Sequence, residues 1–84
     1  MNKDVILIVG SNGQLGTVLT EKLRLIYGTV NVIASDLYKK IGFEDNFITL
    51  DATDFKAVEE VVLKNKITQI YHLAAILSAK GEQN

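Results

Sequence analysis

The sequence of 84 residues has no cysteine and no proline, and its net charge is only −1. The missing cysteine excludes disulfides and thiolate metal sites and is compatible with a cytoplasmic protein. The near-neutral charge gives no electrostatic reason to expect nucleic acid or an anionic membrane as a partner. No apolar run approaches the roughly 20 residues of a membrane span, and the charged start of the chain does not resemble a signal peptide. We therefore expect one small cytoplasmic domain.

Three glycines follow a short apolar run near the start of the chain. Residues 5–9 are continuously apolar, which is typical of a strand buried on both faces, as in a parallel sheet. Gly10, Gly13 and Gly16 come next at three-residue spacing. We expect Gly10 to make a tight turn, Gly13 to let a ligand approach the backbone, and Gly16 to let a helix pack closely on the strand. The N–H groups at the start of that helix suit a pyrophosphate, and a turn without a ligand is the alternative.

Hydrophobic periodicity predicts four strands and two helices. The strands are expected at about residues 4–10, 30–34, 47–50 and 69–73, and the helices at about 14–27 and 55–65. A left-handed Gly28 should end the first helix, and Asp54, or alternatively Thr53, should cap the start of the second. The expected buried faces are Leu15, Val18, Leu19, Leu23 and Ile26 for the first helix, and Phe55, Val58, Val61 and Val62 for the second.

The order of these elements predicts an α/β fold. Residues 37–46 are too polar and too short for a packed helix, so the second and third strands are joined by an irregular segment. Right-handed crossovers then give a parallel sheet with strand order 3-2-1-4. This is the N-terminal half of a Rossmann doubly wound sheet.

Two aspartates end neighbouring strands of this sheet. Asp36 follows the second strand, where a carboxylate can accept hydrogen bonds from the ribose hydroxyls of NAD and repel the 2′-phosphate of NADP. Asp51 follows the third strand, where it can meet the adenine amino group beside the backbone of Ala52. The alternatives are that Asp36 only begins a turn and that Asp51 only begins a helix. Because the glycines and Asp36 point to the same ligand, we favour the binding roles.

The fourth strand ends in small residues and contains the one histidine. Leu73, Ala74 and Ala75 allow a cofactor to lie against the backbone, although tight packing alone explains them equally well. We interpret His72 as a partly buried histidine of an apolar strand, because there is no partner residue for a metal or nucleophile site. No metal site is expected.

Taken together, these residues give the chain a clear family resemblance. The glycine spacing, Asp36, Asp51 and the His-Leu-Ala-Ala run at 72–75 resemble the extended short-chain dehydrogenase/reductases, or NAD-dependent epimerase/dehydratase superfamily. Residues 25–36 and 70–84 are similar to the L-threonine 3-dehydrogenase branch, which is close to the UDP-galactose epimerases. The resemblance covers essentially the whole chain and implies that residues 1–84 form part of an NAD-binding Rossmann domain.

The resemblance also implies a reaction and a role for individual residues. The reaction is NAD-dependent oxidation of L-threonine, a small-molecule substrate, to 2-amino-3-oxobutanoate. By resemblance, Ser78 is a substrate contact, and Asp36 contacts the ribose. The other cofactor contacts are Gly10, Gly13, Gln14, Leu15 and Gly16 at the pyrophosphate, Asp51 and Ala52 at the adenine, and Leu73, Ala74 and Ala75 at the middle and nicotinamide side.

The 84-residue sequence does not contain the residues that transfer protons in this family. Its chemistry uses a Ser or Thr and a Y-x-x-x-K pair, and none of Tyr27, Tyr38 and Tyr71 has a lysine four residues later. We therefore expect an N-terminal piece of a longer enzyme, inactive by itself, that forms homo-oligomers through the open edge of its fourth strand. The alternatives are a UDP-sugar epimerase or dehydratase and a non-catalytic NAD-binding sensor module.

Overall fold

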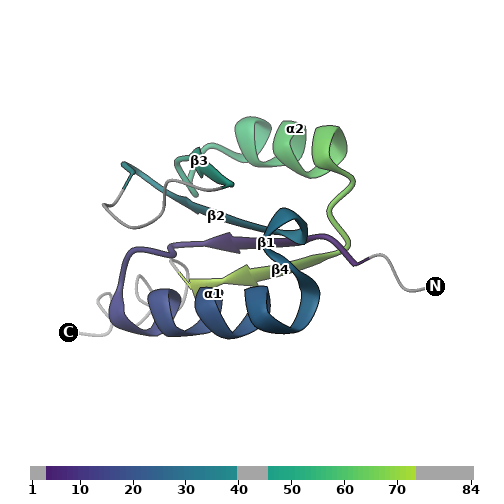
Figure 1. Cartoon of the computed structure of the whole chain (residues 1–84). Helices are drawn as coiled ribbons and strands as arrows, with labels where there is room; N and C mark the ends of the chain where they lie inside the picture. Colours follow the sequence, from purple (N-terminus) through teal and green to yellow (C-terminus); the bar gives the residue numbers. More distant parts are fainter. Residues whose placement is uncertain (1–3, 40–45, 74–84) are drawn as a thin grey trace.

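A computed structural model describes residues 4–39 and 46–73 of the chain. The elements follow the order β1 (Ile6–Val9), α1 (Gln14–Tyr27), η1 (Thr29–Asn31), β2 (Val32–Asp36), β3 (Phe47–Thr49), α2 (Phe55–Asn65) and β4 (Gln69–His72). The strands form one sheet in the order β3-β2-β1-β4, and every neighbouring pair is parallel. Figure 1 shows the helices on opposite faces of this sheet. The predicted α/β class, strand order and direction are confirmed.

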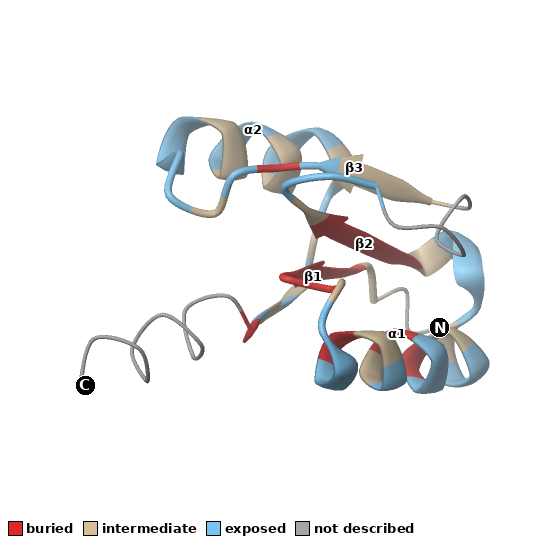
Figure 2. Ribbon diagram, turned by 90° about the vertical axis from the view of Figure 1, so that its left-hand side faces the viewer, coloured by how far each residue is buried: buried red, intermediate tan, exposed pale blue. Residues whose placement is uncertain are grey.

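The core lies on both faces of the two central strands. Every residue of β1 is buried, and Figure 2 shows the buried residues concentrated in β1 and β2. On the face covered by α1, Ile6 and Ile8 pack with Leu23. On the other face, Leu7 and Val9 pack against the half-buried side of α2. A continuous apolar strand is therefore buried from both sides, as the run at residues 5–9 predicts.

The inward face of the first helix is predicted only in part, because Leu19 and Leu23 pack on the sheet as expected and the other three predicted residues do not. Its buried residues are Gly16, Thr20 and Leu23, whereas Leu15, Val18 and Ile26 are exposed. The inward stripe is displaced because Gly16 has to face the strand turn, and Thr20 is buried with its hydroxyl donating to the Gly16 carbonyl within the helix. Because threonine is polar, the hydrophobic pattern does not identify an inward-facing threonine whose hydroxyl donates to a carbonyl of the same helix.

The start of the second strand also differs from the prediction. Residues 29–31 form a 3₁₀ turn, and β2 begins at Val32. The Asn46 amide donates to the carbonyls of Thr29 and Val32 at 2.9 and 3.1 Å, which holds the turn outside the sheet. Gly28 has the predicted positive φ of 91° but a ψ of 141°, so it is not in the left-handed helical conformation.

The second helix matches its predicted bounds, with one exception on its buried face. Asp54 caps it by accepting from the Ala57 N–H at 3.2 Å, as predicted. Val58, Val61 and Val62 pack on the sheet, but Phe55 is 82% exposed. The prediction for Phe55 was wrong because Ala57 takes the inward position in the first turn.

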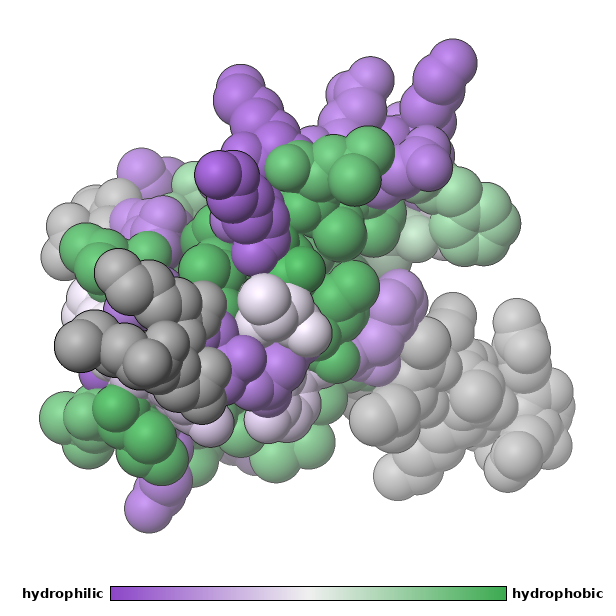
Figure 3. Space-filling view, turned by 90° about the vertical axis from the view of Figure 1, so that its right-hand side faces the viewer, coloured by the Kyte–Doolittle hydropathy of each residue, from purple (hydrophilic) through white to green (hydrophobic). Residues whose placement is uncertain are grey.

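The edge strand β4 exposes part of one face. Tyr71 packs toward α1, whereas Ile70 and His72 alternate onto the opposite face and are exposed. The prediction that His72 is partly buried was therefore wrong, because α2 packs over β1, β2 and the end of β3 and leaves this part of β4 open. Figure 3 shows apolar side chains reaching the surface between hydrophilic ones on one face of the molecule. None of the helices in the described part of the chain is long and apolar enough to span a membrane.

Candidate functional site: a pocket at the carboxyl edge of the sheet

The glycine turn after β1 is fixed to the end of β2 by buried serines. The Ser35 carbonyl accepts from the N–H groups of Gly10 and Ser11 at 2.9 and 3.0 Å and from the Ser11 hydroxyl at 3.2 Å. The Ser35 hydroxyl donates back to the Ile8 carbonyl at 2.8 Å, and both serines are fully buried. These bonds fix the turn to the sheet edge, because the buried polar groups of Gly10, Ser11 and Ser35 named here are paired within the protein.

The three glycines occupy three different environments. Gly10 has a φ of 89°, a conformation that side chains rarely adopt. A Cβ on Gly16 would lie 2.6 Å from the Gly10 carbonyl oxygen, so the helix approaches the turn as closely as glycine allows. A Cβ on Gly13 would meet no heavy atom within 4 Å. Gly13 therefore faces open space at the start of α1.

The N-terminus of α1 carries no internal anion. Gly13 is its N-cap, no side chain caps it, and its first turn contains no acidic residue. Gln14 and Leu15 are exposed here, while Gly16 is buried. The positive end of a helix of 14 residues thus faces outward beside the glycine turn, which is an arrangement that stabilises phosphate groups.

Asp36 connects the end of β2 to the glycine turn. Its Oδ2 accepts from the Asn12 N–H at 2.9 Å, and its Oδ1 accepts from the Leu37 N–H at 2.8 Å. The Asn12 amide in turn donates to the Tyr38 carbonyl at 2.8 Å. These bonds hold the carboxylate in one orientation. Asp36 is half-buried, so it also remains accessible from the pocket.

Asp51 is held in place by a residue two positions later. The Thr53 hydroxyl and the Thr53 N–H donate to Asp51 Oδ1 at 2.7 and 2.9 Å. These two bonds, the hydroxyl one first, lower the pKa of the Asp51 carboxyl below its ordinary value. Asp51 therefore carries its negative charge at neutral pH and down into the acidic range.

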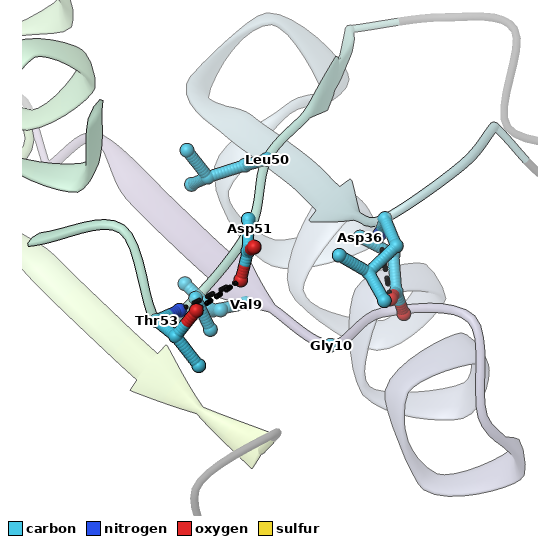
Figure 4. A pocket seen from close by; sticks show the side chains of 8 residues that line it. Val9, Gly10, Asp36, Leu50, Asp51 and Thr53 are labelled. Atoms are coloured by element: carbon cyan, nitrogen blue, oxygen red, sulfur yellow. Dashed lines mark hydrogen bonds between the residues drawn. The ribbon is translucent and has the colours of Figure 1, made fainter.

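One pocket of about 160 Å³ brings these segments together. In Figure 4, Asp51 and Thr53 lie on one side of the pocket and Asp36 on the other, with Gly10 between them. The apolar part of the wall comes from β1 and from the residue that follows β3, and it adjoins the carboxylates. The lining residues are Val9, Gly10, Asp36, Leu37, Leu50, Asp51, Ala52 and Thr53.

The structure gathers only some of the residues that the sequence predicts for the site. Gly10, Asp36, Asp51 and Ala52 line this pocket, and Gly13 to Gly16 begin the adjacent helix. Leu73 is buried in the core on the α1 side of the sheet. Ala74, Ala75 and Ser78 lie outside the described residues. Within residues 4–39 and 46–73, no group of His, Cys, Asp or Glu residues is placed to hold a metal ion.

Sequence reasoning missed several residues that build the site. Leu50 and Thr53 line the pocket, while Ser11, Asn12 and Ser35 fix the turn. The Asp-x-Thr spacing at 51–53 could have indicated Thr53, because the hydroxyl or backbone N–H of a residue two positions later can donate to an aspartate side chain. No sequence signal separates the buried serines from ordinary turn serines.

The residues present fit an NAD molecule. The exposed α1 N-terminus and the open space at Gly13 suit a pyrophosphate, which needs N–H donors and close approach to the backbone. The pocket combines apolar walls with two carboxylates, which suits an adenine ring and ribose hydroxyls. The role of each residue in binding stays a prediction.

Curated proteins similar to this chain include proteins named as threonine dehydrogenases. L-threonine 3-dehydrogenase, mitochondrial, of Sus scrofa is 41% identical over 99% of this chain and 23% of its own length. The inactive L-threonine 3-dehydrogenase, mitochondrial, of Homo sapiens is 42% identical over 94% of this chain and 36% of its own length.

Solved structures of threonine dehydrogenases share the fold. A GalE-like L-threonine dehydrogenase from Cupriavidus necator, in holo form, has a TM-score of 0.80 and 46% identity over 93% of this chain and 26% of its own. A monomeric L-threonine 3-dehydrogenase from a metagenome, in apo form, has a TM-score of 0.76 and 37% identity over 81% of this chain and 22% of its own.

The family model is matched along nearly the whole chain. It is described as the NAD dependent epimerase/dehydratase family, and the match covers residues 6–84. The chain spans about a quarter of the length of the pig relative. The predicted resemblance is thereby confirmed, and the chain belongs to the NAD dependent epimerase/dehydratase family.

Proposed function

We propose that the chain is the adenosine- and pyrophosphate-binding part of the NAD site of a dehydrogenase. The observation that carries the proposal is that Gly10, Asp36, Asp51 and Ala52 line one and the same pocket, next to the uncapped start of α1. These residues come from separate segments, and each offers NAD a different interaction. In an open parallel sheet, ligands bind at this carboxyl edge, near β1, where β2 and β3 are added on one side and β4 on the other.

Each part of the site has a defined task in this proposal. Residues 13–16 hold the pyrophosphate through backbone N–H groups and the positive end of α1, and Gly10, whose N–H donates to Ser35, shapes the turn beside them. Asp36 accepts hydrogen bonds from the ribose hydroxyls, and Asp51 with Ala52 holds the adenine. Leu73, Ala74 and Ala75 are the residues proposed to contact the middle and nicotinamide side, Leu73 through its backbone because its side chain is buried in the core. NAD, when bound, supplies the hydride acceptor.

We further propose that the reaction is oxidation of L-threonine to 2-amino-3-oxobutanoate. The threonine dehydrogenases among the relatives support this substrate, and Ser78 is the proposed contact. A proton-transfer tyrosine with a lysine four residues later is not among the 84 residues, so the part of the reaction that we propose for this chain is to bind and orient NAD. A cytoplasmic location also belongs to the proposal. The pig and human relatives are named as mitochondrial proteins.

A non-catalytic NAD-binding module is the second candidate. The human relative, which is 42% identical, is named as an inactive threonine dehydrogenase, so this sequence pattern also occurs in a protein without that activity. A UDP-sugar epimerase or dehydratase is the third possibility within the family. Assaying the longest polypeptide that the gene encodes separates the three. NAD reduction with L-threonine supports the proposal, whereas turnover of a UDP-sugar, or none with either substrate, overturns it.

Calorimetric titration of the chain with NAD and NADP tests the binding proposal. We expect NAD to bind and NADP to bind at least about tenfold more weakly, because the Asp36 carboxylate repels a 2′-phosphate. Circular dichroism provides the control that the sample is folded. A folded sample that binds neither nucleotide, or binds both equally, contradicts the proposal.

We also propose that the chain forms homo-oligomers through β4. Within residues 4–39 and 46–73, this strand pairs only with β1, and Ile70 on its open face is 46% exposed. Sedimentation velocity should therefore show a mean mass that rises with protein concentration. Ile70→Lys should shift the chain toward monomer, because a charged side chain on an edge strand opposes strand pairing. The solved neighbour described as monomeric represents the competing outcome, a single monomeric species at all concentrations.

A further inference from the structure

Thr53 holds one oxygen of Asp51 and leaves the other to the pocket. Both the hydroxyl and the N–H of Thr53 donate to Oδ1, at 2.7 and 2.9 Å. Within residues 4–39 and 46–73, Oδ2 accepts no hydrogen bond. The same turn is tied down by the Asp54 N–H, which donates to the Asp51 carbonyl at 3.0 Å, and α2 begins immediately after it. The carboxylate therefore has a fixed orientation on a rigid element.

The orientation matters because a carboxylate can only accept hydrogen bonds. Asp51 is ionised at neutral pH, and the Thr53 bonds lower its pKa further, so its remaining oxygen presents an acceptor and no donor. The wall next to it is apolar, from Val9 and Leu50. A flat base on that wall would meet Asp51 with the polar groups at its edge.

We propose that Thr53 is a positioning residue that sets the base specificity of the pocket, favouring a purine with an exocyclic amino group over one with a carbonyl there. Adenine can donate from its 6-amino group to Asp51 Oδ2. Hypoxanthine places a carbonyl oxygen at that position, where it faces the carboxylate and is repelled. The identity of the bound nucleotide rests on the proposed NAD function, whereas the hold of Thr53 on Asp51 does not.

The base preference is tested by titrating the chain with NAD and with nicotinamide hypoxanthine dinucleotide. The wild-type chain should prefer NAD by about tenfold, the order of magnitude of one hydrogen bond to a charged group. Thr53→Val keeps the side-chain shape but removes the hydroxyl, and should reduce the preference to about twofold to threefold. Thr53→Ser keeps the hydroxyl and is the matched control, with the wild-type preference. A Thr53→Val variant with the full preference overturns the inference.

A second measurement reports on Thr53 without any nucleotide. The pKa of the Asp51 carboxyl, followed by NMR, should rise toward its ordinary value in Thr53→Val and stay low in Thr53→Ser. An unchanged pKa in Thr53→Val would mean that the hydroxyl does not hold the carboxylate in solution, and would also overturn the inference. Absence of NAD binding by the folded wild-type chain contradicts the proposed function. Equal binding of NAD and its hypoxanthine analogue contradicts only the base specificity.

Discussion

Replacing Gly16 by alanine should destabilise the fold by about 2–3 kcal/mol, the upper part of the range for overpacking. The new Cβ would lie 2.6 Å from the Gly10 carbonyl oxygen and 2.7 Å from two backbone atoms of Ser11. Backbone cannot move aside here as a flexible side chain would, because the N–H groups of Gly10 and Ser11 both donate to Ser35. The direction is opposite to helix propensity, which by itself favours alanine over glycine by about 1 kcal/mol. Urea unfolding followed by circular dichroism measures the change.

Gly13→Ala is the matched control for this substitution. Gly13 has an extended conformation with a φ of −71°, which alanine also adopts, and nothing lies within 4 Å of the added Cβ. Its stability should stay within about 1 kcal/mol of the wild type, because the poorer N-cap and the stiffer unfolded chain offset each other. Its NAD affinity should nevertheless fall by about tenfold or more, because the methyl group occupies the space proposed for the pyrophosphate.

The two variants separate packing from binding. Equal stability of wild type and Gly16→Ala contradicts the close contact between α1 and the turn. Unchanged NAD affinity in a stable Gly13→Ala variant contradicts the pyrophosphate position. Loss of stability in both indicates that the whole turn, including Gly13, is packed against other parts of the protein.

The sequence pattern predicts those parts of the fold where local and long-range preferences agree. Helix α2 has both a capping aspartate, Asp54, and a valine stripe, so its bounds are predicted correctly. The sheet order follows from the alternation of strands and helices and from the irregular segment after β2. The pattern fails where tertiary contacts choose between local options. The face of α1 is set by Gly16 and Thr20, neither of which reads as apolar core.

The candidate site shows the same division. The residue types Gly10, Asp36 and Asp51 are predicted because each stands at the carboxyl end of a strand, and such ends share one edge of a parallel sheet. The hydrogen bonds that hold these residues in place cannot be predicted in this way. The bond from the Asn12 N–H to Asp36 joins segments 24 residues apart, and it depends on the register of β1 against β2.

Asp36 should control the choice between NAD and NADP. Asp36→Asn removes the charge but keeps the size of the side chain, and we expect its NAD affinity to fall by about tenfold to a hundredfold, as for a lost hydrogen bond to a charged group. The affinity for NADP should fall less or rise, because the repulsion of the 2′-phosphate disappears. The ratio of the two affinities, measured by calorimetry, should therefore move toward NADP.

Asp51→Asn is the control that isolates this effect. It removes the same charge from the other side of the same pocket, and its amide oxygen can still accept from Thr53. If Asp51 faces the adenine, the substitution weakens NAD and NADP about equally, because both nucleotides carry the same base. The ratio should thus change for Asp36→Asn and stay constant for Asp51→Asn. Equal changes in both variants would mean that the charge of the pocket as a whole selects the cofactor. An unchanged ratio in Asp36→Asn would mean that Asp36 only fixes the turn through the N–H groups of Asn12 and Leu37.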